Sequence, residues 1–262
     1  AEIKVNAPVA RILVKGGRAT GIALANGTVS LEIALSAAGI KPGDEVIVSP
    51  ITFVASATAI LRIGAVPVFV DIDPETINLD PNKVAEHINN RTRAIVVVHF
   101  AGHPADLDQL TELCDRHELV MIEDCAHAHG AEWHEQRVGS FGNFGSFSFQ
   151  ASKNMTSGEG GMLITNDAEL AERARSISNQ GRRSGGAWYE HARLGTNARL
   201  TGFQATLLLN QLRRLPEQLQ TRMARARRLQ DGLRKIPGLK PTPLMLDERV
   251  STHGFRIFSM KF

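Results

Sequence analysis

The chain has 262 residues, of which 43% are hydrophobic and 22% are charged, a composition that is ordinary for a folded globular protein. Its 30 lysines and arginines against 27 acidic residues give a net charge of +3, which is too balanced to indicate binding to nucleic acid. No apolar run approaches the ~20 residues of a membrane helix, and the first residues lack the pattern of a signal peptide. The two cysteines, Cys114 and Cys125, form no disulfide framework, so we expect a cytoplasmic protein without a membrane partner.

The first part of the chain predicts a β-hairpin followed by a helix. Residues 9–28 have the pattern of two strands that turn at Gly16 and Gly17. Gly27 and Thr28 then precede a helical pattern over residues 29–39. Free N–H groups and the positive end of the dipole attract anions to a helix N-terminus, so Gly27 and Thr28 are candidate phosphate ligands. The plainer interpretation is that Thr28 only caps the helix.

Between residues 45 and 165 short apolar runs alternate with helical patterns. The predicted strands are 45–49, 66–71, 94–99, 119–124, 145–149 and 161–165, and the predicted helices are 52–63, 81–88 and 105–117. The strands are continuously apolar, which predicts a mostly parallel α/β sheet that helices cover on both faces. The last two strands follow each other too closely for a crossover helix, so we expect a local antiparallel or irregular part of the sheet there.

A long helical pattern begins at Gly202, and we expect Pro216 to interrupt and restart it. The proline-rich run at 237–244 ends the pattern. Residues 250–262 then predict the start of a new unit that contains strands.

Two residues at strand ends suggest a specific chemistry. Asp124 ends one predicted strand, and Lys153 lies just past the end of another, before a glycine-rich run. Ligands of open α/β sheets bind at the carboxyl ends of the strands. A lysine that forms a Schiff base and a carboxylate that holds a pyridinium nitrogen are what a pyridoxal phosphate enzyme needs. Ser148 ends the strand before Lys153 and could reach the phosphate of the same cofactor. Taken alone, Asp124 could cap a helix and Lys153 could be a surface lysine.

The same region has the composition of a metal site. The possible ligands are Glu123, Asp124, His127, His129 and His134. The His-x-His spacing near a cysteine permits zinc and would make the protein a metal-dependent hydrolase. However, no second cysteine pair is present, and an extended segment would turn these groups to alternate faces. We therefore expect no metal, with His127 close to a cofactor hydroxyl and the other two histidines as loop or packing residues.

Five segments resemble the DegT/DnrJ/EryC1/StrS sugar aminotransferases, which are fold-type I pyridoxal phosphate enzymes. They are GDEVIVSPITFVASATAILRIGAVPVFVDIDPETINLD, VHFAGHPADLD, IEDCAHAHGA, VGSFGNFGSFSFQASKNMTSGEGGMLITND and LGTNARLTGFQA. The resemblance is in register from about Ile22 to Leu215 and extends more loosely to Phe262. It implies a three-layer α/β domain with a mostly parallel mixed sheet.

The resemblance also implies a division of the chain into parts. These are an atypical N-terminal segment (1–24), a large cofactor-binding domain (25–200), a long helical connection (201–236) and the beginning of a small C-terminal domain (237–262). Members of the family are longer at both ends, so the sequence indicates a fragment or a fusion in which most of the small domain is missing.

The resemblance assigns roles around the cofactor ring. Lys153 would form the Schiff base and move the proton between Cα and C4′. Asp124 would pair with the pyridine nitrogen. His127 would contact the ring hydroxyl, at a position where the family commonly has glutamine. Phe53 would stack on the face of the ring.

The resemblance also assigns the phosphate ligands. Gly27 and Thr28 would hold the phosphate, with Ser148 beside them. Asn197, in LGTNARL, matches an asparagine that reaches the phosphate of a neighbouring subunit, which implies a homodimer with shared active sites.

The implied activity is transfer of an amino group from glutamine or glutamate to a nucleotide-linked keto-sugar or a keto-cyclitol. The run FSFQASKNMTSGEGG is most similar to members that aminate a keto-cyclitol such as scyllo-inosose or that make aminohydroxybenzoate. The presence of Lys153 disfavours the dehydratase variant of the family, in which histidine replaces the lysine. Because the chain is short, a cofactor-binding or regulatory remnant without turnover is the alternative function.

Overall fold

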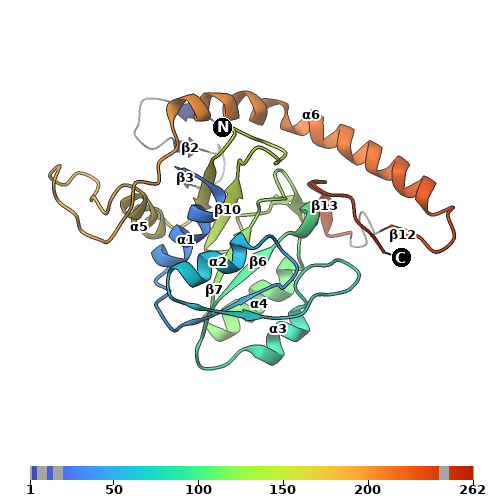
Figure 1. Ribbon diagram of the computed structural model, residues 1–262, viewed down its shortest axis with the longest axis horizontal. Coiled ribbons are helices and arrows are strands. Elements are labelled where there is room, and N and C mark those ends of the chain that lie inside the picture. Colours follow the sequence, from blue (N-terminus) through green and yellow to red (C-terminus); the bar gives the residue numbers. More distant parts are fainter. Residues whose placement is uncertain (1, 5–10, 14–19, 242–247, 262) are drawn as a thin grey trace.

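A nine-stranded sheet forms the centre of the computed structural model, which describes residues 2–4, 11–13, 20–241 and 248–261 (Figure 1). Its strands lie in the order β1 (Glu2–Lys4), β2 (Arg11–Leu13), β3 (Thr20–Leu24), β11 (Gly161–Thr165), β10 (Phe144–Ser148), β7 (Val120–Asp124), β6 (Thr92–Val98), β4 (Glu45–Val48) and β5 (Val66–Phe69). The five strands from β10 to β5 are parallel, whereas β11 is antiparallel to both β10 and β3. The predicted parallel sheet with a local antiparallel part is therefore confirmed.

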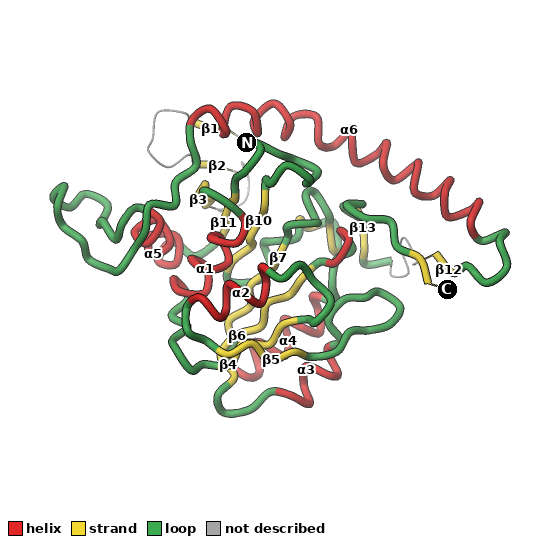
Figure 2. The backbone as a smooth tube through the Cα atoms, in the orientation of Figure 1, coloured by secondary structure: helices red, strands yellow, loops and turns green. Residues whose placement is uncertain are grey.

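Helices cover both faces of this sheet, as Figure 2 shows. One face carries α1 (Gly27–Ala37), α2 (Ala55–Arg62) and α5 (Ala168–Ser178). The other face carries α3 (Pro81–His87) and α4 (Leu107–His117), and α6 (Gly202–Leu233) packs on this face over β3, β11 and β10. The result is the three-layer architecture that the continuously apolar strands predicted.

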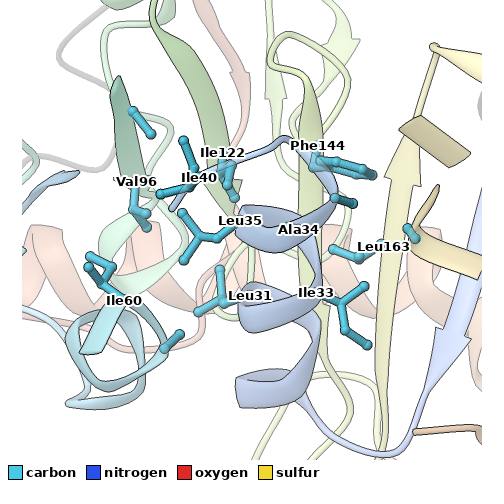
Figure 3. Packing of buried hydrophobic residues seen from close by; sticks show 14 of the residues in the cluster. Leu31, Ile33, Ala34, Leu35, Ile40, Ile60, Val96, Ile122, Phe144 and Leu163 are labelled. Carbon is cyan, nitrogen blue, oxygen red and sulfur yellow. The ribbon is translucent and has the colours of Figure 1, made fainter. Parts of the chain in front are cut away.

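Alternate side chains of each strand enter two different cores. In β4, Val46 and Val48 face α1, whereas Ile47 faces α3 and α4, and all three are fully buried. The core around α1 also contains Leu35 and Ile122 (Figure 3). This alternation explains why the strands are apolar on every residue rather than on every second one.

The helix α1 begins two residues earlier than a threonine cap at position 28 would require. The Oδ1 atom of Asn26 accepts a hydrogen bond from the N–H of Val29 at 2.9 Å, so Asn26 is the N-cap. The interpretation of Thr28 as a plain cap is therefore wrong. Gly27 and Thr28 instead occupy the first turn, where backbone N–H groups have no acceptor within the helix.

The helix predicted over 52–63 begins only at Ala55. The hydroxyl of Ser49 accepts a hydrogen bond from the N–H of Ile51 at 3.1 Å, which holds the residues before the helix in a turn. The side chain of Phe53 is left 67% exposed by this turn.

The expected interruption at Pro216 is wrong, because α6 is one helix of 32 residues that contains this proline. A proline inside a helix costs about 3 kcal/mol through its missing N–H. Leu215 and Leu219 are both buried against the sheet on either side of Pro216, and their packing offsets this cost. The proline itself is exposed.

The segment after α6 pairs with a strand from the middle of the chain. The strand β13 (Val250–Thr252) pairs with β8 (Glu132–Trp133), which also pairs with β9 (Gln136–Arg137). The short strands β12 (Lys240–Pro241) and β14 (Met260–Lys261) pair with each other.

The turn at Gly16 and Gly17 lies outside the described residues, although β2 and β3 pair antiparallel as the hairpin requires. The proposed division into domains stays a prediction. Among the described helices, none is both long and apolar enough to cross a membrane.

We expect Leu35→Ala to lower the free energy of unfolding by about 2–5 kcal/mol, because Leu35 is fully buried in the core around α1. The measurement is urea-induced unfolding followed by circular dichroism. Leu61→Ala is the matched control, since Leu61 is 57% exposed. Equal effects of the two substitutions would contradict the position of α1 in the core.

Candidate active site

The carboxyl ends of β7 and β10 bring the main candidate residues to one edge of the sheet. Asp124, the last residue of β7, is 6% exposed. Its Oδ2 atom accepts a hydrogen bond from the hydroxyl of Ser56 at 2.8 Å, and its Oδ1 atom accepts one from the N–H of Ala126 at 3.1 Å. The sequence analysis missed Ser56. The signal that could have found it is a serine between alanines at the start of a helical pattern, Ala55–Ser56–Ala57.

The N-terminus of α1 lies directly against the end of β10. A Cβ atom at Gly27 would lie 2.6 Å from the Cβ atom of Ser148, so only glycine permits this approach. The hydroxyls of Ser30 and Ser146 are 2.7 Å apart and join the same helix turn to the same strand. The first-turn N–H groups and the Ser148 hydroxyl therefore lie together, as an anion site requires.

Lys153 lies close enough to Asp124 and His127 for their charges to interact. Burial lowers the pKa of Lys153, the guanidinium of Arg256 lowers it further, and Asp124 opposes the shift. Within the described part of the chain, the ammonium of Lys153 makes no hydrogen bond or ion pair. The lysine is therefore available to a ligand, and its neutral form is more accessible than that of a surface lysine.

His127 is held in its neutral form by the same surroundings. Burial lowers the pKa of His127 to about 4, Lys153 and Arg256 contribute in the same direction, and Asp124 opposes them. The Nδ1 atom of His127 is buried without a hydrogen-bond partner. A buried, unsatisfied nitrogen beside Asp124 and Lys153 fits a residue that contacts a bound cofactor.

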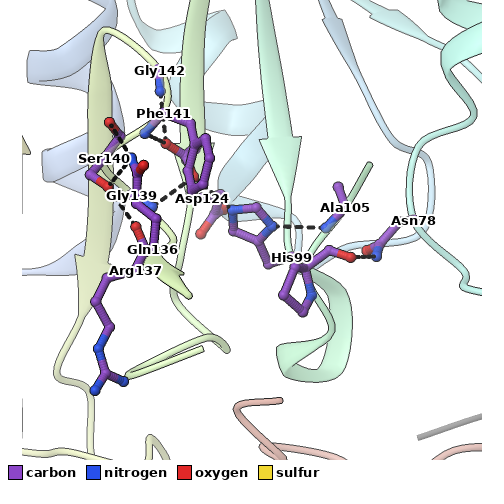
Figure 4. Close-up of polar contacts among 12 residues, drawn as sticks. Asn78, His99, Ala105, Asp124, Gln136, Arg137, Gly139, Ser140, Phe141 and Gly142 are labelled. Atoms are coloured by element: carbon purple, nitrogen blue, oxygen red, sulfur yellow. Dashed lines mark hydrogen bonds and ion pairs between the residues drawn. The ribbon is translucent and has the colours of Figure 1, made fainter. Parts of the chain in front are cut away.

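The residue before Asp124 organises the strand ends. The carboxylate of Glu123 is fully buried and accepts hydrogen bonds from the N–H groups of Gly139 (2.6 Å), Phe141 (2.8 Å) and Gly142 (2.8 Å). It also accepts one from the Nε2 atom of His99 at 3.1 Å. Figure 4 shows the 136–142 loop on one side of Asp124 and His99 on the other. This network fixes the end of β7 and therefore the position of Asp124.

The proposed zinc ligands are not brought together. The Nε2 atom of His134 is hydrogen bonded to Asp108 at 3.1 Å at the surface. Among the described residues, the group that a metal could bridge is His99, Glu123 and Cys125 instead. Its histidine and carboxylate atoms already make the hydrogen bonds of the Glu123 network, because Nδ1 of His99 accepts from the N–H of Ala105 at 3.1 Å.

Phe53 and Asn197 both have exposed side chains. The loop that holds Phe53 is joined to Asp124 through hydroxyls, since Thr52 and Ser56 are 2.9 Å apart. The Oδ1 atom of Asn197 accepts a hydrogen bond from the Nε atom of Arg199 at 2.8 Å. No hydrogen bond within the described residues joins Asn197 to the lysine or to the helix N-terminus. The roles assigned to these two residues stay predictions.

His129 lies behind the candidate site, at an apolar cavity of about 320 Å³ between α6 and the sheet. It is 2% exposed, and its ring lies 5.7 Å from those of Phe147 and Phe149. Burial lowers the pKa of His129 to about 3, against the opposing effect of the Ser148 carbonyl. Neither ring nitrogen makes a hydrogen bond of normal geometry. His129 is therefore a packing residue in this cavity wall, as the sequence suggested.

The sheet order and the helix N-terminus at the end of β10 are those of the fold of type I aminotransferases. The chain belongs to the DegT/DnrJ/EryC1/StrS aminotransferase family, whose model matches residues 13–261. This family depends on pyridoxal phosphate.

The chain is similar to two proteins that are each named L-glutamine:2-deoxy-scyllo-inosose aminotransferase. The protein from Micromonospora echinospora is 48% identical over 225 residues, which are 82% of this chain and 53% of the relative. The protein from Streptomyces fradiae is 46% identical over 226 residues, with 83% and 53% covered. The chain thus spans about half the length of these curated relatives.

A crystal structure of 3-amino-5-hydroxybenzoic acid synthase has the same fold. It superposes with a TM-score of 0.86 and 41% sequence identity, covering 90% of this chain and 62% of the synthase. The resemblance noted in the sequence is therefore confirmed for both the family and the fold.

The depressed pKa values of His127 and His129 predict that stability falls in mild acid. Below about pH 6.5 the unfolded chain binds protons on these rings, whereas the folded chain binds them only near pH 4 and pH 3. The free energy of unfolding should therefore be constant above pH 6.5 with respect to these groups and decrease as the pH falls from there. For His129 the loss is about 2 kcal/mol at pH 5.

The measurement is chemical unfolding at a series of pH values from 7 to 4.5. His129→Leu should flatten the decrease, whereas His117→Gln should leave it unchanged because His117 is exposed. An unchanged slope in His129→Leu would show that His129 does not resist protonation.

Proposed function

We propose that this chain binds pyridoxal 5′-phosphate and transfers an amino group from L-glutamine to a keto-cyclitol, with a nucleotide-linked keto-sugar as the alternative acceptor. The observation that carries the proposal is the position of Lys153, which makes no hydrogen bond or ion pair with any described residue and lies close to Asp124 and His127. The names of the two scyllo-inosose aminotransferases support a cyclitol acceptor and glutamine as donor.

The described residues fit this cofactor. His127 offers a buried nitrogen without a partner to the ring hydroxyl. Asp124 lies at the strand end, where a carboxylate can hold the pyridine nitrogen, and Phe53 would cover one face of the ring. The phosphate would bind where the first turn of α1 meets Ser148.

When bound, pyridoxal phosphate accepts the electron pair that remains on the substrate carbon after its proton is removed. Lys153 would remove and return this proton through its Nζ atom. Its lowered pKa favours that role, because a proton carrier works best when its pKa is near the working pH. The hydroxyl of Ser56 and the N–H of Ala126 donate hydrogen bonds that hold the Asp124 carboxylate in place. Its negative charge therefore has a fixed position, and the carboxylate does not need to move during the reaction.

Mixing the purified chain with pyridoxal phosphate should produce the visible absorbance band of a lysine-linked cofactor. Lys153→Ala should abolish the band because it removes the amine, whereas Lys41→Ala, at an exposed lysine, should retain it. Addition of L-glutamine should then bleach the band. Absence of the band in a folded protein would refute cofactor binding. A band that glutamine does not change would instead favour the alternative of a cofactor-binding remnant without turnover.

We also propose that the active protein is a homodimer in which Asn197 contacts the phosphate bound to the partner subunit. The segment between α5 and α6 extends away from the body of the molecule in Figure 1. It exposes Trp188 (68%), Tyr189 (85%) and Leu194 (98%), and Phe203 in α6 is 76% exposed. Large apolar side chains that gather on one extended segment support a protein interface.

A mixture of two inactive variants tests the shared site. Asn197→Ala should weaken cofactor binding about tenfold or more, since it removes a hydrogen bond to a charged group. Mixed with Lys153→Ala chains, it should regain the band at low cofactor concentration, because each mixed dimer contains one complete site. Arg193→Ala in place of Asn197→Ala is the control, because Arg193 is an exposed residue of the same segment. Failure of the mixture to regain the band, with dimers seen by ultracentrifugation, would refute the role of Asn197.

We place the protein in the cytoplasm, which subcellular fractionation would test. Cys114 and Cys125 are both buried and unpaired. Burial raises the pKa of the Cys114 thiol to about 12 and that of Cys125 well above its ordinary value. Unpaired thiols of this kind support a reducing compartment.

A further inference from the structure

The apolar cavity of about 320 Å³ between α6 and the sheet has the size of a site for a small molecule. Ala23 in β3, Phe147 in β10 and Met162 in β11 line it from the sheet. Ala205 and Leu212 line it from α6. The residues assigned above to the cofactor do not contribute to its wall, so this cavity is separate from the candidate active site.

The cavity offers a ligand no unpaired charge. Among the described residues that line it, only His129 and Arg137 have polar side chains. The Nε atom of Arg137 forms an ion pair with Glu132 at 3.1 Å, and its guanidinium also donates to the carbonyl of Gly130. A charged ligand would lose its hydration here without gaining a partner, so the cavity favours a neutral molecule.

His129 is the one polar group in the wall that lacks a partner. Its ring is 2% exposed, and neither of its nitrogens makes a hydrogen bond with a described residue. The carbonyl of Ser148 is close to the ring but forms no hydrogen bond of normal geometry with it. Water needs several polar partners to be held in a cavity, and His129 alone supplies too few. A buried nitrogen of this kind indicates a ligand that carries one polar group.

The side chains around His129 favour an aromatic ligand. The imidazole ring lies 5.7 Å from the rings of Phe147 and Phe149 and is tilted by 57° and 44° relative to them. Met155 and Met162 also line the cavity, and thioether sulfur makes favourable contacts with aromatic rings. A cavity of about 150 Å³ lined by apolar side chains can bind benzene. A volume of about 320 Å³ therefore accommodates two fused rings.

We propose that this cavity binds a neutral aromatic alcohol of two rings, whose hydroxyl forms a hydrogen bond with His129. A hydroxyl both donates and accepts, so it satisfies whichever nitrogen of the neutral imidazole faces the cavity. The rings would replace empty volume with contacts to α6 and to the sheet. The proposed site does not depend on the aminotransferase function, because it shares no residue with the cofactor site.

Equilibrium dialysis of the full chain against three probes tests the chemistry of the site. The probes are 2-naphthol, naphthalene, which lacks the hydroxyl, and 2-naphthoate, which carries a charged carboxylate instead. We expect saturable binding of 2-naphthol at a single site and about 3–10-fold weaker binding of naphthalene, because naphthalene cannot form the hydrogen bond. Binding of 2-naphthoate should be weaker still, because its charge would be buried without a partner. Added pyridoxal phosphate should not displace 2-naphthol.

Two variants test the place of the site. His129→Leu should remove the preference for 2-naphthol over naphthalene, whereas His117→Leu, at an exposed histidine, should retain it. Ala205→Phe should fill the cavity and abolish binding of both probes. Ala224→Phe is its matched control, because Ala224 is an exposed residue of the same helix that does not line the cavity. Circular dichroism would establish that each variant is folded.

Several outcomes would overturn the proposal. Equal affinities of the native chain for 2-naphthol and naphthalene would exclude the hydrogen bond to His129, as would an unchanged preference in His129→Leu. Undiminished binding in folded Ala205→Phe would place 2-naphthol elsewhere on the surface, and displacement by pyridoxal phosphate would place it in the candidate active site. Binding of 2-naphthoate as tight as that of 2-naphthol would contradict a site for neutral molecules.

Discussion

The buried carboxylate of Glu123 is the interaction on which the geometry of the candidate site depends. Its two oxygens accept three backbone N–H groups from the 139–142 loop and one imidazole N–H from His99. An ionisable group without solvent access is tolerated only when its lone pairs are satisfied, as they are here. Because Asp124 is the next residue in the same strand, the bonds that hold Glu123 also set the depth at which Asp124 leaves the sheet.

The second constraint is the approach of α1 to β10. Glycine at position 27 lets the helix begin against Ser148, and the hydroxyls of Ser30 and Ser146 fix the helix there. The helix N-terminus thus meets the strand end, although 121 residues separate the serine from the glycine that it touches. Near this strand end the charge of Arg256 lowers the pKa of Lys153, because the two cations repel each other.

Much of the fold could be predicted from the sequence, because its signals are local. Continuously apolar runs such as that of β6 predict a strand buried on both faces, and the spacing of Leu107, Leu110 and Leu113 predicts α4. The continuous path of α6 through Pro216 could not be predicted, since it depends on leucines that pack against distant strands. The pairing of β13 with β8 could not be predicted for the same reason. It joins Val250 to Trp133, which is 117 residues away in the chain, and no short motif records such a contact.

The apolar cavity between α6 and the sheet has a mechanical consequence. Its wall is almost entirely carbon, with His129 among the few polar groups, so water gains too few hydrogen bonds to fill it. Empty volume inside a folded protein disappears when the chain unfolds, and hydrostatic pressure favours the state of smaller volume. Hydrostatic pressure therefore favours the separation of α6 from β10 and β11.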